Sequence, residues 1–416
     1  MIGRITSIGH RNPAGRESQG DHRMFSDRTG WPLTPNRLSQ AVERLRAQGI
    51  PILDLAESNP TQVGLQYPEG FLKPLADFRS LVYDPSPKGL SSACQAVVGL
   101  YAQKGIPVSA DQIFLTCSTS EAYSFLFRLL CNPGDSVLVP CPSYPLFEYL
   151  AGLDDVRPSP YRLRYNQKRW EVDFDHLEAA CLPTTRAVIV VHPNNPTGSG
   201  LASEEWRELI SLCQRKNLAL VADEVFADYF YEEDQRIPRT LAGNPDVLVF
   251  SLGGLSKFLG LPQMKLAWIA VTGPKEMVRP ALERLELIAD TYLSVNTPVQ
   301  QALAGWLADP SWIQTRIRER LLRNRRFLLR EVGRAGDPIR CLEADGGWNA
   351  VLRVPAIRDE EKFTLDLLEQ EKVLAHPGYF FDFEEQGYLV VSLLPPPERF
   401  EKGVGKLLAR IARDVS

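Results

Sequence analysis

Three polar residues that follow short apolar runs form the most reactive combination in this 416-residue sequence. Lys257 lies in a glycine-rich turn after VLVFSL, Asp223 ends LALVAD, and Asn195 lies in the turn NNPTG after AVIVVH. A lysine amine forms imines with carbonyl compounds, a carboxylate pairs with a protonated nitrogen, and an amide donates to an oxygen. Taken alone, each residue is more often a surface charge, a helix cap or part of a turn.

Their spacing favours a shared site. Asn195 and Asp223 are 28 residues apart and Asp223 and Lys257 are 34 apart, which leaves room each time for one crossover helix and one strand. A fourth run, IFLTC, leads through Ser118–Ser120 into a helical pattern, and free amides at a helix N-terminus bind anions. Ligands of open α/β sheets bind at the carboxyl ends of the strands. We therefore expect a lysine, a carboxylate, an amide and an anion-binding helix end at one edge of a sheet.

The elements that position these residues alternate between about residues 110 and 275. Short runs rich in Val and Ile predict strands at 113–117, 136–140, 187–192, 218–223, 247–252 and 267–271. Helical patterns lie between them; one has apolar residues at i, i+3, i+4 and i+7 from Trp206, with Ser203 as its N-cap. This alternation predicts the α/β class, with a mostly parallel sheet covered by helices on both faces.

The remainder of the chain predicts a second, smaller α+β domain. Long charged helical patterns begin after residue 275, and the strand-like runs GWNAVLRVP and YLVVSLL are accompanied by helices expected near 361–371 and 398–413. We expect a disordered tail at 1–24 (with Met24 as a candidate start), an arm that belongs in part to the small domain at 25–70, a large domain that carries the site at 71–300, and the C-terminal small domain at 301–416.

Composition argues against several classes of function. The net charge of −4 gives no excess of positive charge for binding nucleic acid or an anionic membrane. No stretch approaches the about 20 apolar residues that a membrane span requires. The seven cysteines are scattered, never spaced as CxxC and typical of a reduced compartment, and the five histidines are equally dispersed. We expect a soluble, cytoplasmic protein without a metal site. No GxGxxG joins a strand to a helix, which argues against a nucleotide-dependent dehydrogenase.

Five motifs together resemble those of the class I/II aminotransferases, which are fold type I pyridoxal-phosphate enzymes. In chain order they are PGDSVLVPCPSYP (133–145), NNPTG (194–198), ADEVF (222–226), LSKFLGLPQMKLAW (255–268) and HPGYFF (376–381). The resemblance covers nearly the whole chain from about residue 30. It implies pyridoxal 5'-phosphate as the cofactor, and a transaminase that moves an amino group between an amino acid, or another amine, and a keto acid.

The resemblance also implies a role for each candidate residue. Lys257 would form the Schiff base with the cofactor and move the proton, Asp223 would pair with the pyridine nitrogen, and Asn195 would donate to the phenolic oxygen. Tyr144 would stack on the ring. The phosphate would be held by Ser118, Thr119, Ser120, Ser256 and Lys265. Tyr83, in YDPSPKG, would reach the phosphate of a neighbouring subunit, which implies a homodimer.

Several positions depart from the family's pattern. Phe226 stands where many relatives have a tyrosine that donates to the phenolic oxygen, and the loss of this donor predicts a raised pKa of the Schiff base nitrogen. Val390 stands where relatives bind the substrate's α-carboxylate with an arginine, a pair worth roughly 3 kcal/mol or more. Arg37 is a candidate replacement but is better explained as a surface residue. Ala93-Cys94 stands where relatives often have an arginine, and we interpret it as structural.

Two alternatives keep the cofactor and change the function. A C–S lyase or a decarboxylase on the same fold would share the motifs, and Val390 keeps those reactions open. A keto acid formed together with the aminated cofactor would favour transamination, whereas a released thiol or carbon dioxide would favour the alternative. A cofactor-sensing regulator fits less well, because only about 25–30 residues precede the fold, too few for a DNA-binding module.

Overall fold

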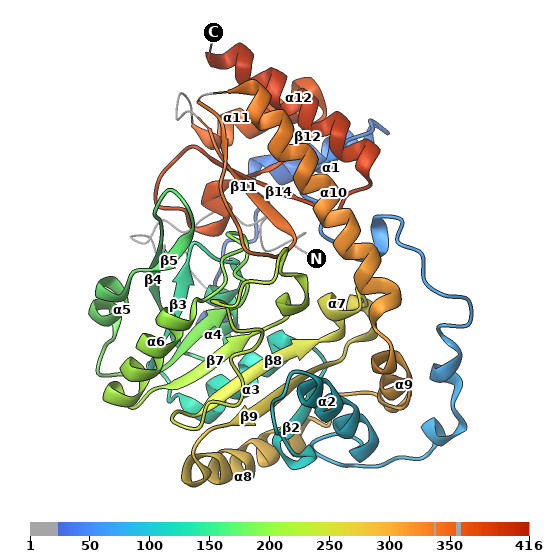
Figure 1. Ribbon diagram of the computed structural model, residues 1–416, viewed down its shortest axis with the longest axis vertical. Coiled ribbons are helices and arrows are strands. Elements are labelled where there is room, and N and C mark those ends of the chain that lie inside the picture. Colours follow the sequence, from blue (N-terminus) through green and yellow to red (C-terminus); the bar gives the residue numbers. More distant parts are fainter. Residues whose placement is uncertain (1–23, 337, 355–358, 416) are drawn as a thin grey trace.

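The computed structural model describes residues 24–336, 338–354 and 359–415 (Figure 1). The tail expected at 1–24 therefore lies outside the described residues, except for Met24. The chain forms a large sheet and a small sheet, and the long helix α10 (Ser311–Ala335) runs from the region of the first to the second (Figure 1). Where one domain ends and the other begins stays a prediction.

The large sheet has eight strands in the order β2-β9-β8-β7-β6-β3-β4-β5. They are β2 (Ile113–Thr116), β3 (Ser136–Cys141), β4 (Arg157–Tyr165), β5 (Trp170–Val172), β6 (Thr185–Val191), β7 (Ala219–Asp223), β8 (Val249–Gly254) and β9 (Ala267–Thr272). All six strands expected from the sequence are present, and β4 and β5 are additional. The strands from β8 across to β4 are parallel, whereas β9 is antiparallel to both of its neighbours and β5 is antiparallel to β4.

The central strands are apolar on both faces because helices cover both. Along β6 and β7, alternate residues enter different cores: Val188 and Leu220 pack with Leu209 of α6, whereas Ile189 and Val221 pack in the cluster that holds α3 and α8. This period of two is the strand geometry that the Val-rich and Ile-rich runs predict.

Helices lie before, between and after the strands of the large sheet, including the two expected after Ser118–Ser120 and near Ser203. They are α2 (Ser91–Gln103), α3 (Thr119–Leu130), α4 (Leu146–Leu153), α5 (Phe174–Ala180), α6 (Ser203–Lys216), α7 (Leu255–Phe258), α8 (Lys275–Tyr292) and α9 (Thr297–Ala308). One detail of the sequence-based prediction is wrong. Ala202 is the N-cap of α6 and Ser203 is its first helical residue, because the side chain of Glu205 takes over the capping by accepting from the Ala202 amide at 2.9 Å.

The small sheet is antiparallel, with the order β10-β11-β14-β13. Its strands are β10 (Arg340–Cys341), β11 (Asn349–Arg353), β13 (His376–Pro377) and β14 (Tyr388–Ser392). Helix α10, helix α12 (Pro397–Val415) and helix α11 (Glu360–Asp366), which continues as a π-helical turn Leu367–Glu371, belong to the same part of the chain. Figure 1 shows α10 and α12 lying side by side over this sheet.

The N-terminal arm returns to the small sheet. Helix α1 (Arg37–Ala47) packs near α11, and β1 (Leu53–Asp54) pairs in parallel with β12 (Val373–Leu374). The next residues stay close to β14, because the Ser392 amide donates to the Leu55 carbonyl at 2.6 Å. The arm thus carries the segment after Leu55 to the junction of the two sheets.

Short 3₁₀ helices complete the fold. They lie at Asp27–Thr29, Pro60–Gln62, Lys73–Ala76, Phe78–Leu81, Ala110–Gln112, Ala227–Tyr229, Pro262–Met264 and Gly378–Phe381. Of the helices in the described residues, none combines the length and the apolar character that crossing a bilayer requires.

Candidate active site

The expected polar segments meet at one edge of the large sheet. Thr116 at the end of β2 and Gly254 at the end of β8 both lie opposite Ala267 of β9, from its two sides. Asp223 lies opposite Leu252 on one side and Val191 on the other. The turns that begin after these residues therefore leave the sheet at the same edge, as the sequence predicts.

Lys257 lies in helix α7, directly after β8, with its side chain between aromatic rings. Its Nζ is 4.8 Å from the ring centroid of Trp348 and 5.6 Å from that of Phe226. The Tyr229 hydroxyl donates to the Lys257 carbonyl at 2.9 Å and fixes the backbone of this turn. Burial lowers the pKa of Lys257 to about 8, while the carboxylates of Asp223 and Glu57 act in the opposite direction. The neutral, nucleophilic form of the amine is therefore more populated near physiological pH than in an exposed lysine.

Asp223 is a buried carboxylate, 8% exposed, at the end of β7. The Tyr123 hydroxyl donates to its Oδ2 at 2.9 Å, and the Val225 amide donates to its Oδ1 at 3.2 Å. Burial raises the pKa of Asp223 to about 6, although these two donors and the charge of Lys257 lower it. A carboxylate in this state is stabilised by a cationic nitrogen brought in by a ligand. The site therefore fits a ligand that presents a protonated ring nitrogen.

Asn195 and Tyr144 belong to the turns after two neighbouring strands, β6 and β3. The amide nitrogen of Asn349 donates to Oδ1 of Asn195 at 2.7 Å, which fixes the plane of that amide. The NH₂ group of Asn195 then points away from Asn349 and is suited to donate to a ligand oxygen. Tyr144 is partly buried, and this burial raises the pKa of its phenol, so the ring is a neutral aromatic surface.

The predicted phosphate-binding residues belong to the N-terminus of α3, to α7 and to the turn before β9, which lie at the same edge of the sheet. Ser118 caps α3 by accepting from the Glu121 amide at 3.1 Å, so Thr119 and Ser120 lie in the first turn, where backbone amides point out of the helix. Burial raises the pKa of the Cys117 thiol, and the charge of Lys265 is among the effects that oppose this, so its ammonium group is within electrostatic reach of the same helix end. Ser256 is the second residue of α7. These hydroxyls, amides and one lysine form a suitable cradle for a phosphate.

Four residues that sequence reasoning did not single out also belong to this region. Tyr123 and Asn349 hold Asp223 and Asn195, and Trp348 faces Lys257. Glu57 acts electrostatically on Lys257 from the segment after Leu55. Of these four, only Tyr123 could have been predicted from the sequence, because it lies one helical turn after Ser120 in the same helix.

Of the positions that bear on the departures from the family, Phe226 packs against Lys257, whereas the others lie in the core or on the surface. Val390 is 1% exposed and is paired with Val351 and His376 within the small sheet. Arg37 has a 71% exposed side chain and an ion pair with Glu361 at 3.3 Å, so it is a surface residue. Ala93-Cys94 is buried in α2, in agreement with a structural role.

Tyr83 lies on the surface, with 73% of the residue exposed. The segment around it is unusually apolar for an exposed surface. Leu72, Phe78, Leu81 and Val82 are between 56% and 83% exposed. Exposed apolar groups of this size gathered in one segment mark an interaction surface.

Metal ligands do not gather in the described part of the chain. No group of three or more His, Cys, Asp and Glu residues there has an arrangement that holds a metal ion. The seven cysteines are all free.

Comparisons with known proteins agree with the geometry. The sequence model of the family described as "Aminotransferase class I and II" matches residues 51–407. The chain is 30% identical to the glutamate-pyruvate aminotransferase AlaA of Haemophilus influenzae over 383 residues, which cover 89% of this chain and 93% of that relative. It is also 30% identical to the alanine aminotransferase of Mycobacterium bovis over 367 residues, or 86% and 84% of the two chains.

Solved structures show the same fold. An alanine aminotransferase from Pyrococcus furiosus superposes with a TM-score of 0.83 at 24% sequence identity, and the match covers 90% of this chain and 96% of the other. An aminotransferase from Escherichia coli superposes with a TM-score of 0.80 at 26% identity over 91% and 95% of the two chains.

Proposed function

The chain belongs to the class I and II aminotransferases, and from this premise we propose that Lys257 is the residue that holds pyridoxal phosphate covalently and moves the proton during amino-group transfer. The chain is a pyridoxal-phosphate-dependent aminotransferase. One observation carries the assignment to Lys257. Its amine lies within electrostatic reach of the buried carboxylate of Asp223, at the strand-end edge where the anion-binding helix end also lies.

The residues around Lys257 fit the cofactor. Asp223 would hold the pyridine nitrogen, Asn195 would donate to the phenolic oxygen, and Tyr144 would cover the ring. The phosphate would be held by Ser118, Thr119, Ser120, Ser256 and Lys265. The fit rests on the raised pKa of Asp223, a buried carboxylate that a protonated ring nitrogen stabilises. When bound, the cofactor supplies an electron-withdrawing ring that stabilises negative charge at the substrate carbon.

The chain's own groups bind, orient and move the proton. The Nζ atom of Lys257 accepts the proton from the substrate carbon and returns it, a task suited to an amine whose pKa is lowered to about 8 by burial. Trp348 and Phe226 pack around Nζ and exclude water from the proton path. Tyr229 keeps the backbone of this turn in place through its bond to the Lys257 carbonyl.

The substrates we propose are small amino acids and keto acids. The relatives at 30% identity are named for alanine or for glutamate and pyruvate, so alanine, glutamate, pyruvate and 2-oxoglutarate are the first compounds to test. The small sheet bears on this choice, because the strand β14 carries no cationic side chain and Val390 faces the core. A substrate carboxylate would then be bound by groups outside β14.

A single-turnover experiment tests the reaction type. The cofactor-loaded protein is mixed with alanine or glutamate without any acceptor, and keto acid, ammonia, thiol and carbon dioxide are measured. Transamination predicts about one keto acid per active site, with the amino group retained on the protein. Free ammonia, thiol or carbon dioxide formed over many turnovers would instead assign the C–S lyase or decarboxylase reaction.

We further propose a cytoplasmic homodimer in which Tyr83 of each subunit reaches the phosphate site of the other. The exposed apolar side chains around Tyr83 support this, because association with a second copy would remove them from water. We propose no nucleic-acid or membrane partner, in keeping with the net charge of −4. Analytical ultracentrifugation tests the dimer: Phe78→Asp is expected to give monomers, and a monomeric wild type would contradict the proposal.

A further inference from the structure

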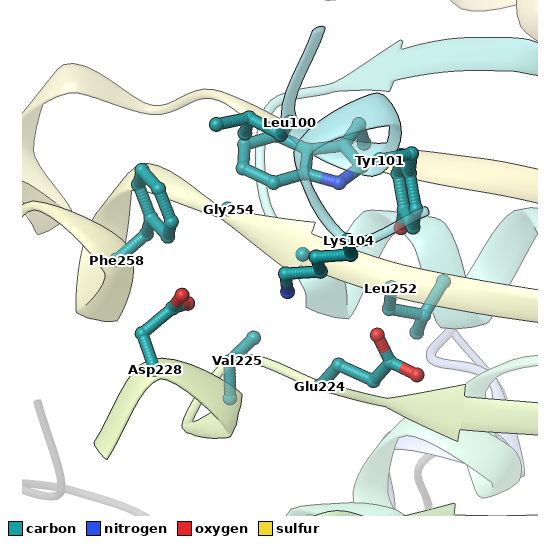
Figure 2. Close-up of a pocket in the computed structure, with 11 residues that line it drawn as sticks. Leu100, Tyr101, Lys104, Glu224, Val225, Asp228, Leu252, Gly254 and Phe258 are labelled. Atoms are coloured by element: carbon teal, nitrogen blue, oxygen red, sulfur yellow. The ribbon is translucent and has the colours of Figure 1, made fainter. Parts of the chain in front are cut away.

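A small cavity lies directly behind the segment that follows Asp223 (Figure 2). Its walls come from the C-terminal end of α2, from three residues of the segment 224–228, from the end of β8 with Phe258 next to Lys257, and from Trp268 of β9. Its volume is about 20 Å³, which is room for one water molecule. The cavity is thus separate from the cofactor site but shares its supporting segments.

Three charged side chains face one another across this cavity. Figure 2 shows the amine of Lys104, from the C-terminal end of α2, pointing between the carboxylates of Glu224 and Asp228. Glu224 is 6% exposed and accepts hydrogen bonds from the Thr240 hydroxyl at 2.7 Å and 2.9 Å and from the Leu241 amide. Burial raises the pKa of Glu224 and of Asp228, and in both cases the charge of Lys104 is the largest effect that lowers it.

The two carboxylates lie on the same segment as two groups of the active site. Glu224 directly follows Asp223, and the Val225 amide donates to the Asp223 carboxylate at 3.2 Å. At the other end of the segment, the Tyr229 hydroxyl donates to the Lys257 carbonyl at 2.9 Å. A shift of this segment would therefore move the Asp223 carboxylate and the backbone of Lys257 together.

Further charged groups act on the two carboxylates. Besides Lys104, the cations that act on Asp228 are Arg239 and Arg318, and Glu224 and Asp228 also repel each other. The phenol of Tyr101, from α2, is the other titratable group in the wall. Since Lys104 acts on both carboxylates, its loss would leave two buried negative charges less compensated, close to Asp223 and Lys257.

We propose that Lys104 is a positioning residue for the active site: together with one water molecule in the cavity, its ammonium group holds Glu224 and Asp228 in place, and through them the carboxylate of Asp223 and the backbone of Lys257. This inference rests on the proposed roles of Lys257 and Asp223. Lys104 is not among the residues to which we assign a contact with the cofactor.

The first test compares Lys104→Met, Lys104→Arg and the control Lys88→Met as cofactor-loaded proteins without substrate. Lys88 pairs with Glu286 at 3.0 Å and does not line the cavity. The readout is the pH midpoint of the visible absorption change of the cofactor. Lys104→Met leaves the negative charges of Glu224 and Asp228 less compensated, and this favours a protonated nitrogen at Lys257, so the midpoint is expected to rise by about half a pH unit or more. Lys104→Arg and Lys88→Met should leave it near the wild-type value.

The second test needs no cofactor. Thermal unfolding of the cofactor-free proteins is measured at pH 5 and pH 8. Burial raises the pKa of Glu224 and of Asp228, and the charge of Lys104 opposes this. Both carboxyls carry more negative charge at pH 8 than at pH 5, so Lys104→Met should lower the unfolding temperature more at pH 8. Adding Asp228→Asn to Lys104→Met should reverse part of the loss at pH 8.

The outcomes separate this inference from the proposed function. An absorption midpoint of Lys104→Met equal to that of Lys88→Met, or equal losses of unfolding temperature at both pH values, would overturn the inference. If Lys104→Met does not fold, Asp228→Asn alone is expected to lower the midpoint, and an unchanged midpoint overturns the inference. A wild-type protein that binds no cofactor at Lys257 contradicts the proposed function, while the unfolding experiment still tests the charge cluster.

Discussion

Both the large and the small sheet pack apolar side chains into the core, but the residues that follow their strands differ in chemical character. Strands β2, β6, β7 and β8 lead directly into the polar segments that meet around Lys257. Strand β14 of the small sheet instead carries Val390 into the core, opposite Val351. The proposed cofactor site is therefore built from strand ends of one sheet. The surroundings of the Lys257 amine also depend on single side chains from other parts of the chain, such as Trp348 and Glu57.

The largest expected effect tests the strand-end half of this comparison. Lys257→Ala removes both the covalent attachment and the proton carrier, so we expect transamination to fall by about 10⁴-fold or more. Steady-state assays with alanine as the amino donor, in which the pyruvate formed is detected, measure the loss of activity. Lys88→Met, a lysine outside the site, is the matched control and should keep its activity. Activity of Lys257→Ala within tenfold of the wild type would rule out the assigned role.

A second prediction separates activity from stability at Asp223. Asp223→Asn should lower kcat/KM by about a hundredfold, because a neutral amide no longer stabilises a protonated ring nitrogen. In the cofactor-free protein, by contrast, Asp223→Asn is not expected to lower the stability. The pKa of Asp223 is raised to about 6 in the folded state, so the wild type loses stability as pH rises from about 4 through 6, and the Asn variant avoids this loss. Urea unfolding at pH 7 should find the variant at least as stable; a clearly less stable variant would contradict this view.

In the small sheet we expect a substitution to lower stability and to leave activity nearly unchanged, which is the reverse of Asp223→Asn. Val390→Ala removes two methyl groups from a fully buried position, so we expect the free energy of unfolding to fall by about 1–2 kcal/mol, with kcat/KM changed less than about twofold. Urea titration and steady-state kinetics on the same preparation measure both. A raised KM for the amino donor without loss of stability would show that this position belongs to the substrate site after all.

The last prediction, which needs no substitution, is a pH dependence. An amine must be neutral to attack the cofactor, and the pKa of Lys257 is lowered to about 8. The rate of cofactor attachment to the cofactor-free protein should therefore rise about tenfold between pH 7 and pH 9 and then level off. Stopped-flow absorbance measures this rate. A rate that keeps rising past pH 10 would be that of an ordinary exposed lysine.

Most strands of the large sheet could be predicted from the sequence, for a physical reason. Its central strands are buried on both faces and so consist of unbroken apolar runs. Strands β4 and β5 lie at the edge and lack this signal, since β4 contains Pro158 and Pro160 together with exposed arginines. The antiparallel direction of β9 was equally hidden, because an apolar run is the same in either direction.

The candidate site divides in the same way. Lys257, Asp223 and Asn195 were predictable because each follows a recognisable strand. Trp348, Asn349 and Glu57 come from parts of the chain far away in sequence, and only the packing of the small sheet and the arm brings them near Lys257. The cluster of Lys104, Glu224 and Asp228 also depends on a helix that precedes its partners by more than 100 residues.

Chemical reduction of the cofactor-loaded protein, followed by peptide mapping, tests the assignment of Lys257 most directly. Borohydride converts a cofactor–lysine imine into a stable amine, and mass spectrometry then locates the added mass. We predict that it lies on Lys257, in the peptide containing LSKFLGLP, with none on Lys265 or Lys104. Label on another lysine, or no label on a protein that has bound the cofactor, would contradict the role proposed for Lys257.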